Sequence, residues 1–302
     1  MMPKKIDFIG LGFCSNDYLC ILPYIPIDSK VQMLSYDVQG GGPAGTATVA
    51  AARLGMSAAF VGTIGDDDAG NRILSDFNSE NVDTQFLRIR KNACSPVAYC
   101  WIEQKTGHRS VAWTRGDIQE LQAGDIDEDL IRNAKILHLD GHNPVGALQA
   151  CKIAKANHVL INLDAGTLRD GIKPLIEYAD ILIASEEFAC AYSGESDLEK
   201  ALIKMKKIGA LVTGVTMGSR GSMIYDHGEF IRCPAFPVKN VVDTTGCGDV
   251  FHTGFGVRYL ETKDLLDCQR FGAAVSALKC GKMGGRAGIP TREAVENFLR
   301  KN

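Results

Sequence analysis

The sequence predicts an α/β fold: a doubly wound, mostly parallel sheet with helices on both faces, plus a small β-sheet lid. From residue 58 onward, short apolar runs alternate with helical patterns, as in the βα units of a parallel sheet. No internal repeat or low-complexity linker divides the chain, so residues 1–302 are expected to form one domain. Segments 18–39 and 95–115 alternate in a strand-like period outside that rhythm, which predicts the short strands of the lid.

The expected elements follow the chain in order. Residues 6–13 form an apolar run that ends in glycine, which predicts a buried strand. Pro43 suits the first turn of a helix and Gly55 suits its end, so a helix is expected over 43–55. The segment from Lys105 to His108 predicts a hairpin turn in the lid. The later alternation predicts strands over 58–63, 135–140, 159–164, 180–184, 210–216 and 222–225, and helices over 69–79, 145–156, 171–177, 197–207, 249–261, 264–280 and 291–300.

The composition bears on the class of partner and on location. The formal net charge is -3, which gives no basic footprint for a nucleic acid. No apolar run approaches the roughly 18 residues of a membrane span, and the run 6–11 is too short for a signal-peptide core. The 10 cysteines include no Cys-x-x-Cys pair, which argues against a zinc site or a disulfide framework and favours a cytoplasm with reduced thiols.

One stretch, residues 242–251, has the pattern of an anion site. An apolar run ends there, Gly246 and Gly248 permit a tight turn, and a helical pattern follows. Unpaired amides and the helix dipole at such a turn attract an anion. A carboxylate at Asp249 would repel phosphate, so its presence favours a base that takes a proton from an attacking hydroxyl. The alternative is a simple turn in which Asp249 caps the helix.

The same stretch, DTTGCGDVFHTGF, resembles the C-terminal signature of the PfkB, or ribokinase-like, sugar kinases. Cys247 stands where that family has alanine. Residues 40–47 (GGGPAGTA) with ARLG and GTIGDD further on resemble the N-terminal signature, about two hundred residues earlier as in the family. The resemblance covers nearly the whole chain. It implies an ATP-dependent kinase of this fold that transfers the γ-phosphoryl group of MgATP to a hydroxymethyl group of a sugar.

The resemblance also implies the catalytic and nucleotide-binding residues. Asp249 would be the base, and the amides from Gly246 through Cys247 and Gly248 to Asp249 would bind the transferring phosphoryl group. The segment from Val215 to Gly221 resembles a family motif along the nucleotide, and residues 273–285 resemble the wall of the adenine pocket. The implied ATP-binding residues are Ser185, Thr216, Gly218, Gly221, Gly246, Gly248 and Cys280.

For the sugar, the resemblance implies contacts from Asp17, Gly41, Gly42 and Gly45. Gly45 replaces an asparagine of the family that contacts substrate, which argues against ribose. Several segments are most similar to the sulfofructose kinases of the family, whose acceptor is a ketose with a sulfonate group. The implied sulfonate lysine is Lys30, while the matching arginine is His142 or absent. His138 and His142 flank Asp140 at a strand end, where they can line the sugar pocket. A fructose-like ketose and 6-sulfofructose both remain open.

The metal site departs from the family pattern. Asp164 ends a strand, where relatives place an acid near the triphosphate. The family's N-x-x-E motif, which orders magnesium, falls on Ser185 and Phe188, so Glu187 or Glu186 would have to substitute. Otherwise the metal depends mainly on phosphates and water. The resemblance further implies a potassium ion at Asp243 and Thr245, as in some relatives.

Other functions remain open at this point. A purine nucleoside kinase has the same fold, and Trp101, Trp113 and Tyr99 of the lid segments could stack on a base. A non-catalytic sugar or nucleotide sensor is the reading favoured by the altered metal motif and opposed by the intact GCGD. A dehydrogenase is disfavoured, because no G-x-G-x-x-G follows the first strand. In relatives the lid closes over the sugar and often pairs with a second lid, which implies a homodimer.

Overall fold

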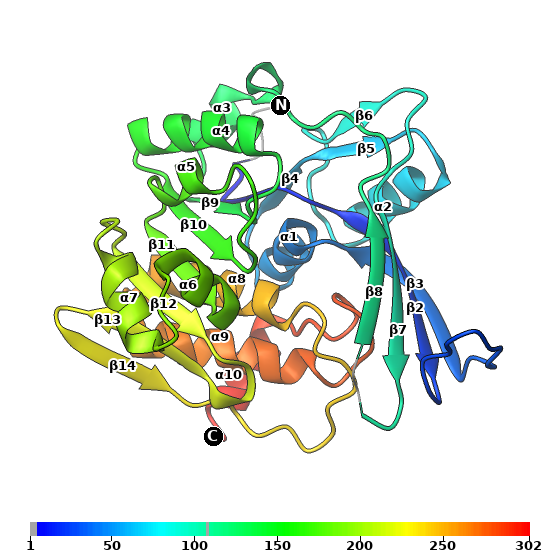
Figure 1. Cartoon of the computed structure of the whole chain (residues 1–302). Coiled ribbons are helices and arrows are strands. Elements are labelled where there is room, and N and C mark those ends of the chain that lie inside the picture. The colour runs from blue at the N-terminus through cyan, green and yellow to red at the C-terminus, as the bar shows by residue number, and fades with distance from the viewer. Residues whose placement is uncertain (1–4, 107–108) are drawn as a thin grey trace.

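The computed structural model describes residues 5–106 and 109–302 and contains a large central sheet with a smaller sheet beside it (Figure 1). The large sheet has the strand order β14-β13-β12-β11-β10-β9-β1-β4. From β4 across to β12 the strands are parallel, and β13 and β14 form an antiparallel edge. The predicted mostly parallel sheet is therefore confirmed. Its strands are β1 (Phe8–Leu11), β4 (Ala58–Val61), β9 (Ile136–Leu139), β10 (Leu160–Ala165), β11 (Ile181–Ser185), β12 (Val212–Thr216), β13 (Ser222–Asp226) and β14 (Glu229–Cys233).

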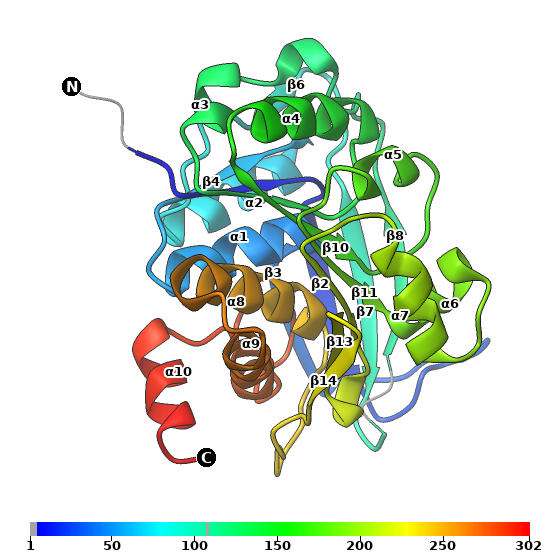
Figure 2. The ribbon, with the colours of Figure 1, turned by 90° about the vertical axis from the view of Figure 1, so that its left-hand side faces the viewer.

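Helices cover both faces of the large sheet (Figures 1 and 2). On each face, a separate set of buried core residues lies between the helices and the sheet. One core holds α3 (Glu128–Arg132), α4 (Pro144–Ala156), α5 (Lys173–Ile176), α6 (Glu186–Ser193) and α7 (Leu198–Lys206). On the other face lie α1 (Pro43–Arg53), α2 (Asp68–Ser79), α8 (Cys247–Thr262), α9 (Leu265–Lys279) and α10 (Arg292–Leu299). Each fully buried Leu, Ile or Phe side chain contributes about 2 kcal/mol of hydrophobic stabilisation.

The sheet reverses its winding between β1 and β9. The chain goes from β1 to its neighbour β4 on one side, and from β9 it proceeds strand by strand to the other side. At such a switch point the carboxyl ends of two parallel strands leave a crevice that α/β proteins use for ligands. Asp140, just after β9, connects the segments around this crevice. Its carboxylate accepts hydrogen bonds from the amides of Phe13 (2.8 Å), Ala44 (3.1 Å) and His142 (2.9 Å).

The smaller sheet has the order β3-β2-β7-β8 and confirms the strands expected for the lid. Its strands are β2 (Ser15–Leu22), β3 (Ser35–Gly41), β7 (Val97–Glu103) and β8 (Arg109–Thr114). The strand β2 begins three residues earlier than expected, so Asp17 lies inside a strand. The predicted hairpin turn at 105–108 falls partly on residues 107 and 108, which lie outside the described residues, although β7 and β8 do pair as an antiparallel hairpin.

Strand alternation gives the smaller sheet two different faces. Asp17, Ala98 and Trp113 are cross-strand neighbours and share one face. Tyr18 and Tyr99 are also neighbours and share the opposite face, where their rings stack 4.9 Å apart. Only the first face turns toward the crevice, as the lining of the pockets below shows.

Several element boundaries differ from the expectation. The expected strand 58–63 divides into β4 and β5 (Thr63–Gly65), and β5 pairs with β6 (Arg88–Arg90). The expected helix 171–177 is reduced to α5, because Gly171 has a φ of 81° and cannot continue a right-handed helix. The elements α3, α6, β6 and β14 were not predicted. None of the helices described for 5–106 and 109–302 combines the length and apolar character needed to cross a bilayer.

Candidate active site

The glycine-rich turn at the start of α8 has the predicted form. Gly246 has a φ of 78° and immediately precedes the helix, a conformation that favours glycine. The Cys247 amide donates to the Thr244 carbonyl at 3.2 Å. One of the four amides predicted for an anion is thus already bonded, and the amides of Gly246, Gly248 and Asp249 remain for a ligand. Ser276 of α9 donates to the Cys247 carbonyl at 2.7 Å and fixes the turn.

Asp249 lies in the first turn of α8 and is half-buried. Burial, followed by the nearby Asp164 and Asp140 carboxylates, raises its pKa to about 7, while His252 and Lys279 oppose that rise. Gly246 rather than Asp249 occupies the N-cap position of α8, so the alternative in which Asp249 caps the helix does not hold. A carboxylate with a pKa near neutrality is well matched to accepting a proton at physiological pH.

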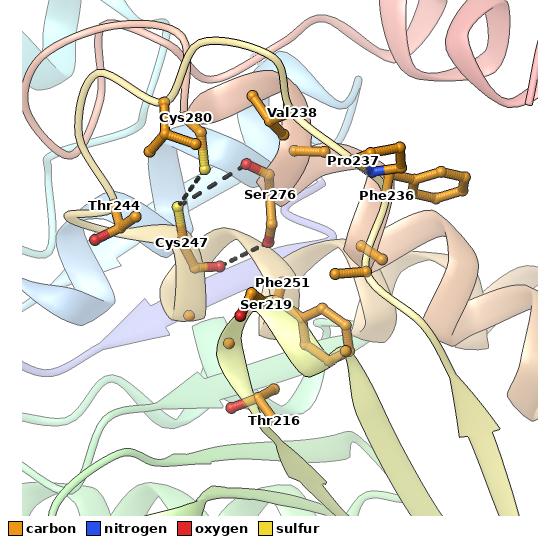
Figure 3. Close-up of a pocket in the computed structure, with 17 residues that line it drawn as sticks. Thr216, Ser219, Phe236, Pro237, Val238, Thr244, Cys247, Phe251, Ser276 and Cys280 are labelled. Carbon is orange, nitrogen blue, oxygen red and sulfur yellow. Dashed lines mark hydrogen bonds between the residues drawn. The ribbon is translucent and has the colours of Figure 1, made fainter.

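One pocket, which we call the apolar pocket, lies between β12, the segment 235–241 and helices α8 and α9, with a volume of about 520 Å³ (Figure 3). Phe251, Phe236 and Val238 line it, together with small residues of α9. The predicted ATP-binding residues Thr216, Gly218, Gly221, Gly248 and Cys280 all line this pocket, whereas Ser185 and Gly246 lie outside its lining.

Gly221 is required for the backbone of the apolar pocket. Its φ is 92°, and a Cβ atom added there would lie 2.0 Å from the Cys233 carbonyl oxygen. The residue therefore lets the β12–β13 turn pass close to the end of β14.

The second pocket, the lid pocket, lies between the smaller sheet and the carboxyl ends of β1, β9 and β10, with a volume of about 810 Å³. Of the predicted sugar-binding residues, Asp17, Gly42 and His142 line it. Lys30 is exposed in the β2–β3 connection and is not part of this lining. The lid pocket also contains three arginines that were not predicted: Arg109, Arg115 and Arg169.

Gly41 and Gly45 act through their neighbours. A Cβ atom at Gly41 would lie 2.0 Å from the Asp17 carboxylate, so the glycine makes room for that side chain. A Cβ atom at Gly45 would lie 2.4 Å from the guanidinium of the buried Arg286. That guanidinium donates to the Gly41 carbonyl at 2.7 Å and lies 4.7 Å from the Phe77 ring centroid. Arg286 therefore fills the space beside Gly45.

Asp17 is buried with 6% of its surface exposed. Burial raises its pKa, against the opposing effects of the Ser15 hydroxyl, which donates to it at 2.5 Å, and of Arg286. An acid held in this way on the inner face of the smaller sheet can accept hydrogen bonds from ligand hydroxyls.

Asp164 does not stand free as a metal ligand. Its carboxylate lies 2.8 Å from Nδ1 of His252, and both side chains are buried. The His252 charge lowers the pKa of Asp164, and Asp164 raises that of His252, so the two form a buried ion pair. His252 follows Asp249 by three residues on α8, which places this pair behind the turn. The sequence did not single out His252.

The altered metal motif has a clear structural cause. Ser185 caps α6 by accepting from the Phe188 amide at 3.0 Å, and Phe188 is fully buried in the core. Glu186 pairs with Arg220, while Glu187 is exposed in the first turn of α6. Among residues 5–106 and 109–302, no group of three or more His, Cys, Asp or Glu side chains could hold a metal ion.

The proposed potassium ligand Asp243 already has partners. One carboxylate oxygen accepts from the Thr245 amide (2.8 Å) and hydroxyl (2.7 Å), and the other accepts from the Gly284 amide (2.8 Å). The buried Lys279 ammonium donates to the Asp243 carbonyl at 3.0 Å. A fixed positive charge therefore already stands beside this carboxylate.

Comparison with known proteins identifies the family of the chain. The family model described as pfkB family carbohydrate kinase matches residues 16–292. The chain is 27% identical to a ribokinase of Haemophilus influenzae, covering 96% of this chain and 97% of the relative. It is 30% identical to an ATP-dependent ribose-1-phosphate kinase of Halopiger xanaduensis, covering 90% of each. The solved structure of Arabidopsis thaliana ribokinase complexed with ribose and ATP is 25% identical, covers 98% of this chain and 99% of that chain, and superimposes with a TM-score of 0.85. The chain thus belongs to the pfkB family of carbohydrate kinases.

Proposed function

We propose that this protein is an ATP-dependent kinase that phosphorylates a hydroxymethyl group of a ketose, with Asp249 as the base. One observation supports this most strongly: the turn before α8 forms a wall common to both pockets. Thr244, Cys247 and Gly248 line the apolar pocket, and Thr245 lines the lid pocket. A phosphoryl group could pass between ligands in the two pockets at this turn, and Asp249 with the free amides belongs to it.

In this proposal ATP occupies the apolar pocket, with adenine against α9 and the phosphates toward the turn. The acceptor hydroxyl oxygen bonds to the γ-phosphorus while the bond from that phosphorus to the β–γ bridging oxygen breaks. The hydroxyl proton passes to the Asp249 carboxylate, and ADP leaves. Free amides aimed at the transferring group stabilise its charge by about 3 kcal/mol each in comparable sites. Magnesium bound to the phosphates would supply further charge neutralisation.

The acceptor would occupy the lid pocket, where Asp17 accepts hydrogen bonds from its hydroxyl groups. A fructose-like ketose and 6-sulfofructose both fit the pattern of residues. Arg286 beside Gly45 supports an acceptor other than ribose, because the family's asparagine is absent and its place is filled. The relative named ATP-dependent ribose-1-phosphate kinase supports acceptors that already carry a charged group.

A homodimer through the smaller sheet is part of the proposal. The face of that sheet turned away from the pocket exposes Tyr36 (57%) and Tyr99 (49%) beside Tyr18. An exposed aromatic face of this kind is typical of protein interfaces. Light scattering of the purified protein should give twice the chain mass of 32.6 kDa. In the Tyr99→Asp variant, the measured mass should fall toward that of a single chain.

All ten cysteines are free thiols, which supports a reducing compartment.

A purine nucleoside kinase is the second candidate, and Trp113 is the observation that favours it. This ring lines the lid pocket, 54% exposed, with Phe13 5.7 Å away in an edge-on contact. Such a corner could hold a base. Tyr99 and Trp101 lie on the opposite strand face, so they do not add to it.

The test is ADP release from MgATP with a panel of acceptors: fructose, 6-sulfofructose, fructose 6-phosphate, ribose, 2-keto-3-deoxygluconate and adenosine. We expect turnover with a ketose. Turnover with adenosine alone would give Trp113 a base-stacking role and replace the ketose proposal. If no acceptor is used although calorimetry detects ATP binding, the non-catalytic sensor would become the better interpretation.

A further inference from the structure

Two arginines from distant parts of the chain converge on one histidine in the lid pocket. Arg115 follows strand β8 of the smaller sheet, and its Nη2 lies 2.8 Å from Nδ1 of His142. Arg169 lies in the loop after β10, and its Nη1 contacts both ring nitrogens of the same histidine. His142 itself follows β9 and stacks on Phe13, 4.8 Å away. Three separate elements thus bring cationic or polar groups to one end of the pocket.

The histidine cannot satisfy both arginines. Burial and the two guanidinium groups lower the pKa of His142 to about 4, although Asp140 opposes them, so the ring is neutral near pH 7. A neutral imidazole has one nitrogen that accepts a hydrogen bond and one that donates. At most one guanidinium can therefore donate to it well. The second guanidinium and the imidazole N–H are therefore left as donors without an acceptor inside this cluster.

Nearby carboxylates do not neutralise Arg169. Among the described residues, none lies within ion-pair distance of its guanidinium, and its Nε is buried without a hydrogen-bond partner. Glu120 pairs with Arg115 at 2.6 Å, but both side chains are over a third exposed, so this contact is weak. Asp140 is occupied by three backbone amides. Asp17 and Asp170 are the other acids in the lining; Asp17 is bonded to Ser15, and Asp170 is exposed.

We propose that Arg115, Arg169 and His142 form a subsite for a tetrahedral oxyanion, so that the acceptor is a sugar carrying a phosphate or sulfonate group. The inference rests on the proposed kinase function and narrows its substrate class. Two guanidinium groups and one imidazole N–H, carried by three separate elements, supply several donors, which suits a group with three terminal oxygens. The sugar ring would lie between this subsite and Asp249, with its hydroxymethyl group toward the turn.

The experiment compares kcat/KM for fructose, fructose 6-phosphate, 6-sulfofructose and 2-keto-3-deoxygluconate in four enzymes. These are the wild type, Arg169→Gln, Arg169→Lys and Arg72→Gln, the last an exposed arginine on α2 that serves as the matched control. We expect the wild type to prefer a tetrahedral anion over fructose by about 100-fold, the range for charged hydrogen bonds. Arg169→Gln should lose most of that preference while fructose changes less than threefold. Arg169→Lys should recover part of it, and Arg72→Gln should match the wild type.

Three results would overturn the subsite. One is a wild type that uses fructose as well as the charged sugars, and another is an Arg169→Gln enzyme that loses both equally. Preference for the carboxylate acceptor over both tetrahedral anions would be the third. The relative use of the phosphate and the sulfonate identifies which anion is bound. If no sugar is phosphorylated, only the kinase proposal fails. Calorimetry with fructose 6-phosphate then tests the subsite: it should bind the wild type more tightly than Arg169→Gln, and equal binding would overturn the subsite.

A second, independent observation concerns the apolar pocket, where two thiols face each other. Sγ of Cys247, at the turn, lies 3.3 Å from Sγ of Cys280, at the end of α9, and Figure 3 shows both in the pocket wall. Both are partly exposed. The hydrogen bond from Cys247, aided by Lys279, lowers the pKa of Cys280 to about 7 against the effect of burial. Cys280 is therefore substantially a thiolate at neutral pH, the form that oxidants attack.

We infer that Cys247 and Cys280 are a site of reversible oxidation by peroxide. The Cys280 thiolate attacks one oxygen of hydrogen peroxide and becomes a sulfenic acid, and the other oxygen leaves as hydroxide, which takes up a proton to form water. The Cys247 sulfur then displaces the hydroxyl group from Cys280, and its own proton leaves with that group as a second water. Two electrons pass from the two sulfurs to peroxide. The new bond would tie the anion-binding turn to α9 and lower activity.

The test treats the full-length protein with hydrogen peroxide and measures both activity and the Cys247–Cys280 linked peptide by mass spectrometry. We expect loss of activity in step with that peptide, recovery with dithiothreitol, and protection by bound ATP. Cys280→Ser, scaled to its own untreated activity, should lose less than the wild type, whereas Cys94→Ser, at an exposed cysteine elsewhere, should lose as much. Absence of the linked peptide from the inactivated enzyme would overturn the inference.

Discussion

The apolar pocket and the lid pocket lie on either side of one turn but are built differently. Every lining residue of the apolar pocket comes from the segment between Thr216 and Cys280, and most are small or apolar. The lid pocket collects residues from Phe13 through Asp170 and then Thr245, and it contains three arginines. This difference is what we expect if, as proposed, the apolar pocket binds ATP and the lid pocket binds an acceptor that carries its own charge.

Asp249 lies in the first turn of α8, next to the residues that line both pockets, so its loss should have the largest effect. We expect Asp249→Asn to lower kcat by about 10³-fold, within the range for general-base catalysis. Binding of ATP, measured by calorimetry, should change less than threefold, because the apolar pocket remains. Asp129→Asn, at a carboxylate 83% exposed on α3, is the matched control. An Asp249→Asn enzyme with normal turnover would exclude Asp249 as the base.

The pH dependence of kcat/KM tests the role of Asp249 in the unmodified protein. Asp249 must be ionised to accept a proton, and its pKa is raised to about 7. Above that pH kcat/KM should therefore be level, and below it kcat/KM should fall about tenfold per pH unit. His142, with a pKa near 4, should add no second step between pH 6 and 9. ATP affinity measured over the same pH range distinguishes protonation of Asp249 from protonation of the nucleotide. A profile that stays level down to pH 5.5 would contradict the assignment.

Filling the apolar pocket should affect the nucleotide alone. Ala277 of α9 lines that pocket, and Ala277→Leu would occupy space that the proposal gives to adenine. Overfilling a formed site costs roughly 1–3 kcal/mol, so we expect KM for ATP to rise about tenfold with KM for the sugar unchanged. Equal increases in both Michaelis constants would show that the pockets are not separate.

Exchange of potassium for sodium should have the smallest effect. The Asp243 carboxylate accepts three hydrogen bonds, and Lys279 already places an ammonium group beside it. We therefore leave potassium out of the proposed reaction and expect kcat/KM to change less than twofold between the two salts. A tenfold loss without potassium would restore the ion implied by the family resemblance.

The contrast between the pockets also explains what the sequence could predict. The turn at Gly246 and the β12–β13 turn are local, so glycine spacing and the following helical pattern predict them directly. The Ser185–Phe188 region was interpreted as a metal motif, although its residues cap and anchor the unpredicted helix α6. Local spacing alone cannot distinguish these roles, because core packing of Phe188 decides between them.

The lid pocket was harder to predict because its chemistry depends on tertiary contacts. Arg115 and Arg169 lie 54 positions apart and meet only because the smaller sheet folds against the end of β10. Each looks like an ordinary surface arginine in the sequence. The buried partners His252 and Arg286 were missed for the same reason. Lys30, chosen by resemblance, lies in an exposed connection, whereas the arginines that the resemblance did not supply line the pocket.

The most direct test of two separate pockets is a four-enzyme comparison of the wild type, Arg169→Gln, Ala277→Leu and the double variant. KM for ATP and for the preferred charged sugar would be measured in each. The account predicts that Arg169→Gln changes only the sugar constant, that Ala277→Leu changes only the ATP constant, and that the double variant shows both changes added. Either single variant changing both constants to the same degree would contradict it.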